Sequence, residues 1–202
     1  INTADVADII WGCNVQRGPN GNDMGRMSAL DAGYDITSSG VTLDRFCGSG
    51  ITTVNMAAAS IMSGMEDMVI AGGCEMMSGY GRLAAETSPF VDSGNMHLRE
   101  MYGQSHQGLC ADTIATIEGI PREALDQLAE VSQQRAAHAI ENGYFDRSLV
   151  PVYHDDGSLA LDKDEFPRPG TTMESLGQLQ PSFEKLTNMP LDEEGTTYAN
   201  LM

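Results

Sequence analysis

The fold class can be predicted from residues 40–78, which read GVTLDRFCGSGITTVNMAAASIMSGMEDMVIAGGCEMMS. This stretch opens with a run at 40–47 that mixes apolar and β-branched residues, as a strand does. A run rich in Ala and Met follows, apolar nearly all round, which predicts a buried helix. Residues 68–78 are apolar again, and an earlier apolar run at 5–13 predicts another strand. Strands and helices at this spacing predict an α/β layer with a parallel pair of strands.

Cys47 stands where a predicted strand gives way to a helix, and Gly48, Ser49 and Gly50 follow it. Glycine permits a sharp turn, and the start of a helix presents unpaired N–H groups and the positive end of the helix dipole. Those groups favour a thiolate over a thiol, and they can stabilise an oxyanion on an acyl group. Cysteine is also among the residues most often buried for packing alone. From the residues by themselves, a nucleophile and a buried structural thiol both remain open.

The sequence changes in character after Tyr80. Residues 81–105 are polar and irregular, and helices are expected after them at 108–119 and 121–143. A hairpin is predicted around Gly157, and a short helix between two prolines beyond it. We therefore expect a boundary near residue 80, with helices and a hairpin in the second part.

Composition excludes several classes of protein. The 202 residues include 11 basic and 29 acidic ones, and the formal net charge of -18 repels nucleic acids and anionic membranes. The four cysteines lie far apart, so neither a disulfide framework nor a zinc site is expected, and reduced thiols favour a cytoplasmic protein. Neither a run of 18 apolar residues nor a signal peptide occurs. Because the chain begins at Ile1 and stops at YANLM, we interpret it as an internal portion of a longer protein.

The stretch DRFCGSGITTVNMAAASIMSGMEDMVIAGGCEMMS resembles the nucleophile segment of the thiolases. That family's pattern is N-[RK]-[FV]-C-[SG]-S-G, followed by an Ala-rich helix and A-G-G-x-E-x-M-S. The resemblance continues through SHQGLCADTIA, PREALDQLAEVSQQRAAHAI and DEFPRPGTTMESLGQLQPSF, so it covers nearly the whole chain.

The resemblance implies a fold and its division. Thiolases have two similar α/β halves stacked in α-β-α-β-α layers, with a loop domain inserted in the first half that helps to bind coenzyme A. On that template, residues 1–80 are a partial N-terminal core domain with a layered α-β-α arrangement. Residues 81–202 are the helical and hairpin loop domain. The chain would then be a fragment of the full fold.

The resemblance also implies a reaction and its residues. Thiolases cleave a 3-ketoacyl-CoA with coenzyme A, or condense two acyl-CoA molecules, by way of an acylated thiolate. Cys47 matches that thiolate, and its own N–H matches part of the oxyanion hole. His106, in SHQG, matches a substrate-pocket histidine in the motif H-M-G, with Gln107 in place of Met. Coenzyme A would be a substrate, with no permanently bound cofactor and no metal, and the sequence assigns no coenzyme A contact residue.

The chain departs from the family pattern at several points. The later G-H-P histidine and the C-x-G cysteine are absent from these residues, so we expect the 202-residue chain alone to be inactive. Asp44 stands where the family usually has Asn, and only two lysines are present to meet a coenzyme A phosphate. Glu75, in GGCEMMS, is expected to be a polar anchor that accepts backbone N–H groups. Gly72 and Gly73 are expected to permit close packing.

Two alternative functions stay open. One is a condensing enzyme similar to the ketoacyl synthases, and the other is a non-catalytic thiolase-like subunit that binds acyl-CoA or a partner protein. The family resemblance further implies a homodimer or homotetramer.

Overall fold

The computed structural model describes residues 1–78, 91–102, 105–190, 192 and 194–201. The chain divides into two compact units, residues 1–87 and 88–202, and each has its own set of helices and strands. The boundary predicted near residue 80 lies in the segment 79–90, outside the described residues.

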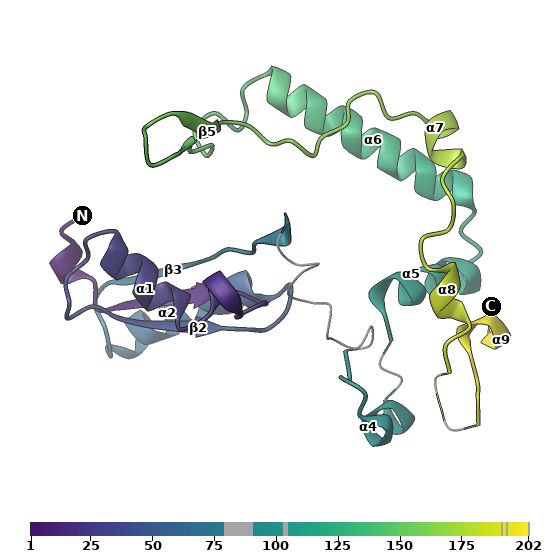
Figure 1. Cartoon of the computed structure of the whole chain (residues 1–202), viewed down its shortest axis with the longest axis horizontal. Helices are drawn as coiled ribbons and strands as arrows, with labels where there is room; N and C mark the ends of the chain where they lie inside the picture. Colours follow the sequence, from purple (N-terminus) through teal and green to yellow (C-terminus); the bar gives the residue numbers. More distant parts are fainter. Residues whose placement is uncertain (79–90, 103–104, 191, 193, 202) are drawn as a thin grey trace. The chain divides into compact units, whose positions relative to one another are not determined.

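The first unit contains a parallel three-stranded sheet (Figure 1). Its strands are β1 (Asp8–Gly12), β2 (Ser39–Leu43) and β3 (Val69–Gly73), in the order β2-β1-β3. Asp8 of β1 is in register with Ser39 on one side and with Val69 on the other. The predicted strand–helix–strand layer with parallel pairing is therefore confirmed, and β1 is its central strand.

Helices α1 (Met24–Asp31) and α2 (Ser49–Ser63) cover opposite faces of this sheet. Gly25 of α1 lies so close to Trp11 that a Cβ on it would meet the Trp11 side chain, and Gly12 lies equally close to Ser49 of α2. Trp11 and Gly12 are consecutive in β1, so their side-chain directions point to opposite faces. The buried cluster of Val6, Ile9 and Ala29 lies on the α1 face, with Trp11 packed against it.

The prediction that α2 is buried all round is wrong. Its buried residues are Ser49, Thr52, Thr53 and Ala57, which are small, so the helix approaches the sheet closely. The larger apolar side chains point away from the strands, and Ile51 and Met62 are 72% and 86% exposed. An all-round apolar pattern does not reveal which side of a helix is covered. Among the described residues of this unit, no further layer covers the outer face of α2.

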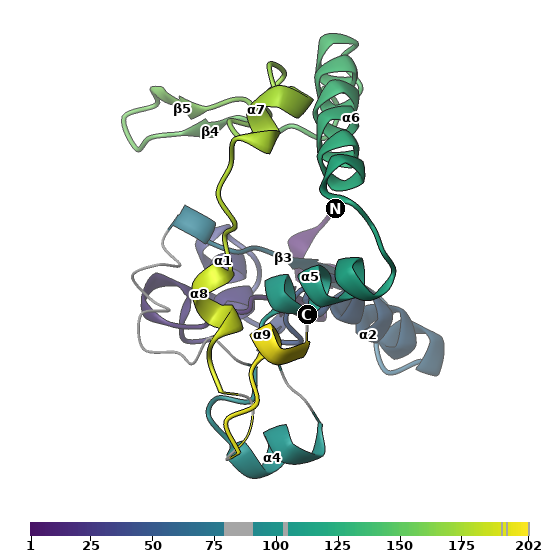
Figure 2. The same ribbon diagram turned by 90° about the vertical axis from the view of Figure 1, so that its right-hand side faces the viewer.

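The second unit is mainly helical (Figure 2). Its helices are α4 (Met96–Met101), α5 (Gln107–Ile117), α6 (Arg122–Glu141), α7 (Met173–Gly177), α8 (Glu184–Thr187) and α9 (Tyr198–Leu201). Strands β4 (Val152–Tyr153) and β5 (Leu159–Leu161) form an antiparallel hairpin whose turn includes Gly157 at φ +82°. The two predicted long helices, the hairpin and the short helix are confirmed.

Helix α4 forms inside the region predicted to be irregular. Asn95 caps it by accepting the N–H of Leu98, and Arg99 closes an ion pair with Asp92 at 2.5 Å. Both charged side chains are buried, and the hydrogen bonds from Arg99 lower the pKa of the Asp92 carboxyl. The cap and the Asp92–Arg99 contact join this six-residue helix to the segment before it, and helix propensity alone does not predict a helix this short.

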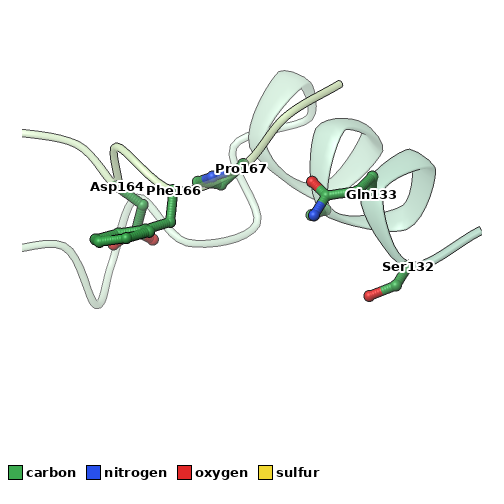
Figure 3. A pocket seen from close by; sticks show the side chains of 6 residues that line it. Ser132, Gln133, Asp164, Phe166 and Pro167 are labelled. Atoms are coloured by element: carbon green, nitrogen blue, oxygen red, sulfur yellow. The ribbon is translucent and has the colours of Figure 1, made fainter. Parts of the chain in front are cut away.

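Helix α6 packs against α7 and against the segment that follows β5. Arg122 joins α6 to α7 by donating to the carbonyl of Leu176 at 2.6 Å, and the N–H of Arg168 donates to Gln133 Oε1 at 2.7 Å. A hollow of about 320 Å³ lies beside the Gln133 contact (Figure 3) and is lined by Ser132, Gln133, Ala136, Asp164, Phe166 and Pro167. Within the described parts of the chain, no helix combines the length and the apolar character needed to cross a membrane.

Candidate active site

Cys47 lies in the turn that joins β2 to α2. Helix α2 begins at Ser49. Its N-cap residue is Gly48, which has no side chain to cap the helix. Cys47 is exposed and is not part of a disulfide. The alternative of a buried structural thiol is therefore wrong for this cysteine. Its place directly ahead of the start of α2 is the position that the sequence predicts for it.

The turn before Cys47 has an unusual backbone conformation. Phe46 has φ +49°, in the left-handed region that bulky residues rarely adopt. The Ser49 hydroxyl closes the turn, because it donates to the carbonyl of Phe46 at 2.7 Å and accepts the N–H of Arg45 at 2.9 Å. The N–H of Gly48 also donates to the carbonyl of Arg45 at 3.1 Å. These bonds form a sharp strand-to-helix turn that leaves Cys47 exposed.

Three polar residues connect the ends of all three strands. The Glu75 carboxylate, after β3, accepts the N–H of Asn14 at 2.8 Å and the N–H of Val15 at 3.4 Å. The Asn14 side chain, after β1, donates through Nδ2 to Asp44 Oδ1 at 3.0 Å. Asp44 follows β2 and also accepts the N–H of Phe46 at 2.7 Å. We call Glu75, Asn14 and Asp44 the strand-end link, and within it Glu75 is the polar anchor that the sequence predicts.

Two other cysteines lie beside the strand-end link. Cys13 is buried, with its Sγ 3.9 Å from Glu75 Oε1 and 3.7 Å from the carbonyl oxygen of Val15. Burial, reinforced by the negative charge of Glu75, raises the pKa of the Cys13 thiol above its ordinary value. Cys74 accepts a hydrogen bond from the indole Nε1 of Trp11 at 3.3 Å.

The two glycines before Cys74 leave room for their neighbours. A Cβ on Gly72 would collide with the Trp11 ring, and a Cβ on Gly73 would collide with the carbonyl oxygen of Gly12. The predicted role of these glycines in close packing is therefore confirmed.

His106 belongs to the second unit, where it is the N-cap of α5. Its Nδ1 accepts the N–H of Gly108 at 3.1 Å, and its ring centroid lies 4.9 Å from that of Phe183. Because Nδ1 accepts this bond, the proton of the neutral ring is on Nε2. A Cβ on Gly108 would collide with the Phe183 ring, so the glycine of SHQG is needed for this packing. Phe183 closes the stretch DEFPRPGTTMESLGQLQPSF, 77 positions after His106, and nothing in the sequence pairs it with that histidine.

Cys47 and His106 therefore lie in different units, each with a defined local geometry. In the described ranges, no group of three or more His, Cys, Asp or Glu side chains is arranged to hold a metal ion.

Comparisons with known proteins extend over nearly the whole chain. Residues 1–191 match the family model described as "Thiolase, N-terminal domain". A beta-ketoadipyl-CoA thiolase of Acinetobacter baylyi is 37% identical over 196 residues, which cover 89% of this chain and 49% of that protein. A 3-ketoacyl-CoA thiolase of Saccharophagus degradans is 37% identical over 186 residues, which cover 91% of this chain and 46% of that protein.

A solved structure agrees with these sequence matches. The crystal structure of the Bacillus anthracis acetyl-CoA acetyltransferase is similar with a TM-score of 0.72 and 29% identity, over 90% of this chain and 48% of that one. The chain thus spans about half the length of the relatives it matches. The fold, the motif around Cys47 and the family match agree that this chain belongs to the thiolase family, as an N-terminal thiolase portion.

Proposed function

We propose that the full-length protein is an acyl-CoA acyltransferase of the thiolase type. It would cleave a 3-ketoacyl-CoA with coenzyme A, or condense two acyl-CoA molecules. The observation that carries the proposal is the exposed Cys47 thiol ahead of α2, within the residues that match the thiolase model. The similarity to a beta-ketoadipyl-CoA thiolase and to an acetyl-CoA acetyltransferase supports this class of reaction.

The first chemical step takes place at the Cys47 sulfur. In the direction of condensation, the thiolate attacks the thioester carbonyl of an acyl-CoA, a new carbon–sulfur bond forms, and coenzyme A leaves as its thiol after taking up a proton. A second acyl-CoA then loses a proton from its α-carbon, which offsets the proton taken up by coenzyme A, and that carbon attacks the acyl carbonyl. A carbon–carbon bond forms, the carbon–sulfur bond to Cys47 breaks, and the thiolate is restored, which is a ping-pong sequence. The N–H groups of Gly48 and Ser49 donate to the carbonyls of Arg45 and Phe46. The N–H of Cys47 and the positive end of the α2 dipole suit the negative charge that develops on the carbonyl oxygen.

We assign His106 to the substrate pocket of the same enzyme. Its Nδ1 is occupied by the N–H of Gly108, so Nε2 is the nitrogen that can contact a substrate. A protonated Nε2 donates a hydrogen bond, which suits a carbonyl oxygen of an acyl-CoA. The Phe183 ring beside it restricts the rotation of the imidazole.

The test of this proposal is to trap the acyl enzyme. The full-length protein is incubated with acetyl-CoA and digested, and the peptides are examined by mass spectrometry. We expect an acetyl group on the peptide that contains Cys47, and unmodified Cys13 and Cys110 peptides. An enzyme that turns over while its acetyl group sits on another residue would refute the assignment of Cys47. Absence of both turnover and acetylation would favour the non-catalytic alternative.

We further propose that the 202-residue chain is inactive by itself. The nucleophile is present, whereas the G-H-P histidine and the C-x-G cysteine of the family are absent from these residues. Thiolysis of acetoacetyl-CoA is measured with this chain and with the full-length protein. Turnover by the 202-residue chain would contradict the proposal.

The assembly and the compartment complete the proposal. We propose a cytoplasmic homodimer or homotetramer that uses coenzyme A as a substrate and holds no metal and no permanent cofactor. None of the four cysteines is in a disulfide, which suits a reducing compartment. Light scattering on the full-length protein tests the assembly, and a monomer at all concentrations would contradict it.

A further inference from the structure

Asp44 connects the end of β1 to the turn that carries Cys47. A single carboxylate oxygen, Oδ1, accepts the backbone N–H of Phe46 at 2.7 Å and the side-chain Nδ2 of Asn14 at 3.0 Å. Hydrogen bonds to an ionised carboxylate are stronger than those between neutral groups. Asp44 therefore fixes the backbone of the turn to a neighbouring strand.

The residue that Asp44 fixes has a conformation that needs support. Phe46 has φ +49°, which is unfavourable for an aromatic residue. Its side chain is 62% exposed, so packing of the ring does not impose this backbone conformation. The bonds that do constrain it are the N–H bond to Asp44 and two bonds to its carbonyl, from the hydroxyl and the backbone N–H of Ser49.

The other partner of Asp44 is itself anchored. The backbone N–H of Asn14 donates to Glu75 Oε2 at 2.8 Å, and the N–H of Cys13 next to it donates to the carbonyl of Leu43 at 3.0 Å. The Asn14 side chain therefore belongs to a segment that is bonded to β2 and to Glu75, which lies after β3. Because Asp44 binds both this side chain and the N–H of Phe46, it holds the turn at a fixed place relative to β1.

We propose that Asp44 is a positioning residue for Cys47. Its carboxylate, held by Asn14, keeps Phe46 in the left-handed conformation and thereby sets the Cys47 thiol at the start of α2. The inference rests on the proposed role of Cys47 as nucleophile. Asparagine, the residue that the family pattern usually has at this position, offers the same acceptor oxygen, so the role needs an oxygen acceptor and not a negative charge.

The test compares the rate at which iodoacetamide alkylates Cys47 in variants of the full-length protein. Asp44→Leu removes the acceptor and is expected to slow alkylation about tenfold, because Phe46 then leaves its strained conformation. Asp44→Asn retains an acceptor oxygen, and its rate should stay within about twofold of the parent. Asp44→Asn removes the same negative charge as Asp44→Leu, so slower alkylation in Asp44→Leu alone reports lost position.

A second substitution tests the mechanism. Glycine adopts a positive φ without steric strain, so adding Phe46→Gly to Asp44→Leu should restore the rate to within about threefold of the parent. A general loss of folding would not be restored by a glycine. The matched control is Asp35→Leu, because Asp35 Oδ1 also accepts a backbone N–H two residues on, that of Thr37 at 2.9 Å, but ahead of β2. This control should leave Cys47 alkylation unchanged.

The outcomes separate this inference from the proposed function. If Cys47 of the parent reacts no faster than the exposed Cys110, the nucleophile assignment fails. If Cys47 reacts fast, and Asp44→Leu leaves its rate unchanged or the double variant stays as slow as Asp44→Leu, the positioning role is overturned while the nucleophile stands. Should Asp44→Leu fail to fold by circular dichroism, Asn14→Ala carries the test, with an expected slowing of about threefold. An unchanged rate there would overturn the role.

Discussion

Cys13 and Cys47 follow neighbouring strands of one parallel sheet, but their surroundings are opposite. Cys13 comes directly after β1, is 1% exposed, and has its sulfur beside the Glu75 carboxylate, so its pKa is raised. Cys47 comes after β2, is exposed, and lies ahead of α2. The residues after each strand make the difference. After Cys13, Glu75 binds the backbone of Asn14 and Val15 and draws the loop inward, whereas glycines and a helix follow Cys47.

A position at the end of a strand therefore does not by itself determine whether a thiol is accessible or ionised. A buried thiol beside a carboxylate is held neutral, whereas an exposed thiol at a helix start is accessible to a substrate. The same three polar residues serve both cysteines, because the strand-end link encloses Cys13 and supports the turn of Cys47.

The largest difference between Cys13 and Cys47 is expected when each sulfur is removed in turn. In the full-length protein, Cys47→Ala is expected to lower kcat for acetoacetyl-CoA thiolysis by about a thousandfold or more, because the acyl acceptor is lost. Cys13→Ala should keep kcat within about threefold, since this sulfur is buried. Steady-state kinetics measures both. Equal losses in the two variants would show that the thiols are not functionally distinct.

Alkylation rates measure the difference in accessibility and ionisation between Cys47 and Cys13. At pH 7, iodoacetamide should modify Cys47 about a hundredfold faster than Cys13, because Cys13 is buried and its raised pKa keeps it as a thiol. Labelling of Cys13 should rise only at a pH above the ordinary pKa of a cysteine thiol, because burial and Glu75 raise the pKa of Cys13. Peptide mass mapping over a pH series measures both rates. Similar rates for the two residues at pH 7 would contradict the prediction.

Glu75 tests whether the two strand ends depend on one anchor. Glu75→Ala leaves the N–H groups of Asn14 and Val15 without their acceptor and should lower the free energy of unfolding by about 1–3 kcal/mol. Urea denaturation measures the loss. Glu75→Gln, which retains one acceptor oxygen, is the control and should lose less. A Glu75→Ala protein as stable as the parent would show that Glu75 does not anchor this loop.

The smallest expected effect is the dependence of stability on alkaline pH. The folded state raises the pKa of Cys13, so below its unfolded value the neutral thiol is present in both states and its contribution to stability is complete. As the pH rises through the folded pKa, that contribution is lost. Cys13→Ala should therefore show a shallower fall in the urea midpoint between pH 8 and pH 11 than the parent does. A steeper fall in Cys13→Ala would refute the sign.

Short sequence patterns predicted the helices, strands and turns that are formed by residues close together in the sequence. The alternation before Cys47, the Ala-rich run after it and the turn at Gly157 each describe one short segment, and the structure has β2, α2 and the β4–β5 hairpin there. The motif also predicted the position of Cys47 at a strand–helix junction. The role of His106 in the substrate pocket stays a prediction.

Features that join distant residues could not be predicted in the same way. Asn14 contacts Asp44 across 30 positions and Glu75 across 61, and these contacts require β1 to lie between β2 and β3. No single segment of sequence states that order. Helix α4 was missed because its six residues are too few for helix propensity to predict it, and the exposed outer face of α2 was missed because hydropathy does not specify what covers a surface.

The placement of β1 between β2 and β3 has a consequence for access to the sulfur. The chain leaves β1 toward one face of the sheet to form α1, and it leaves β2 toward the other face to form α2. At such a reversal of winding direction the two departing segments diverge, and open α/β sheets hold their ligands at these points. Were the strands arranged in order of sequence, both helices would share one face, and the second connection would no longer turn away from the first.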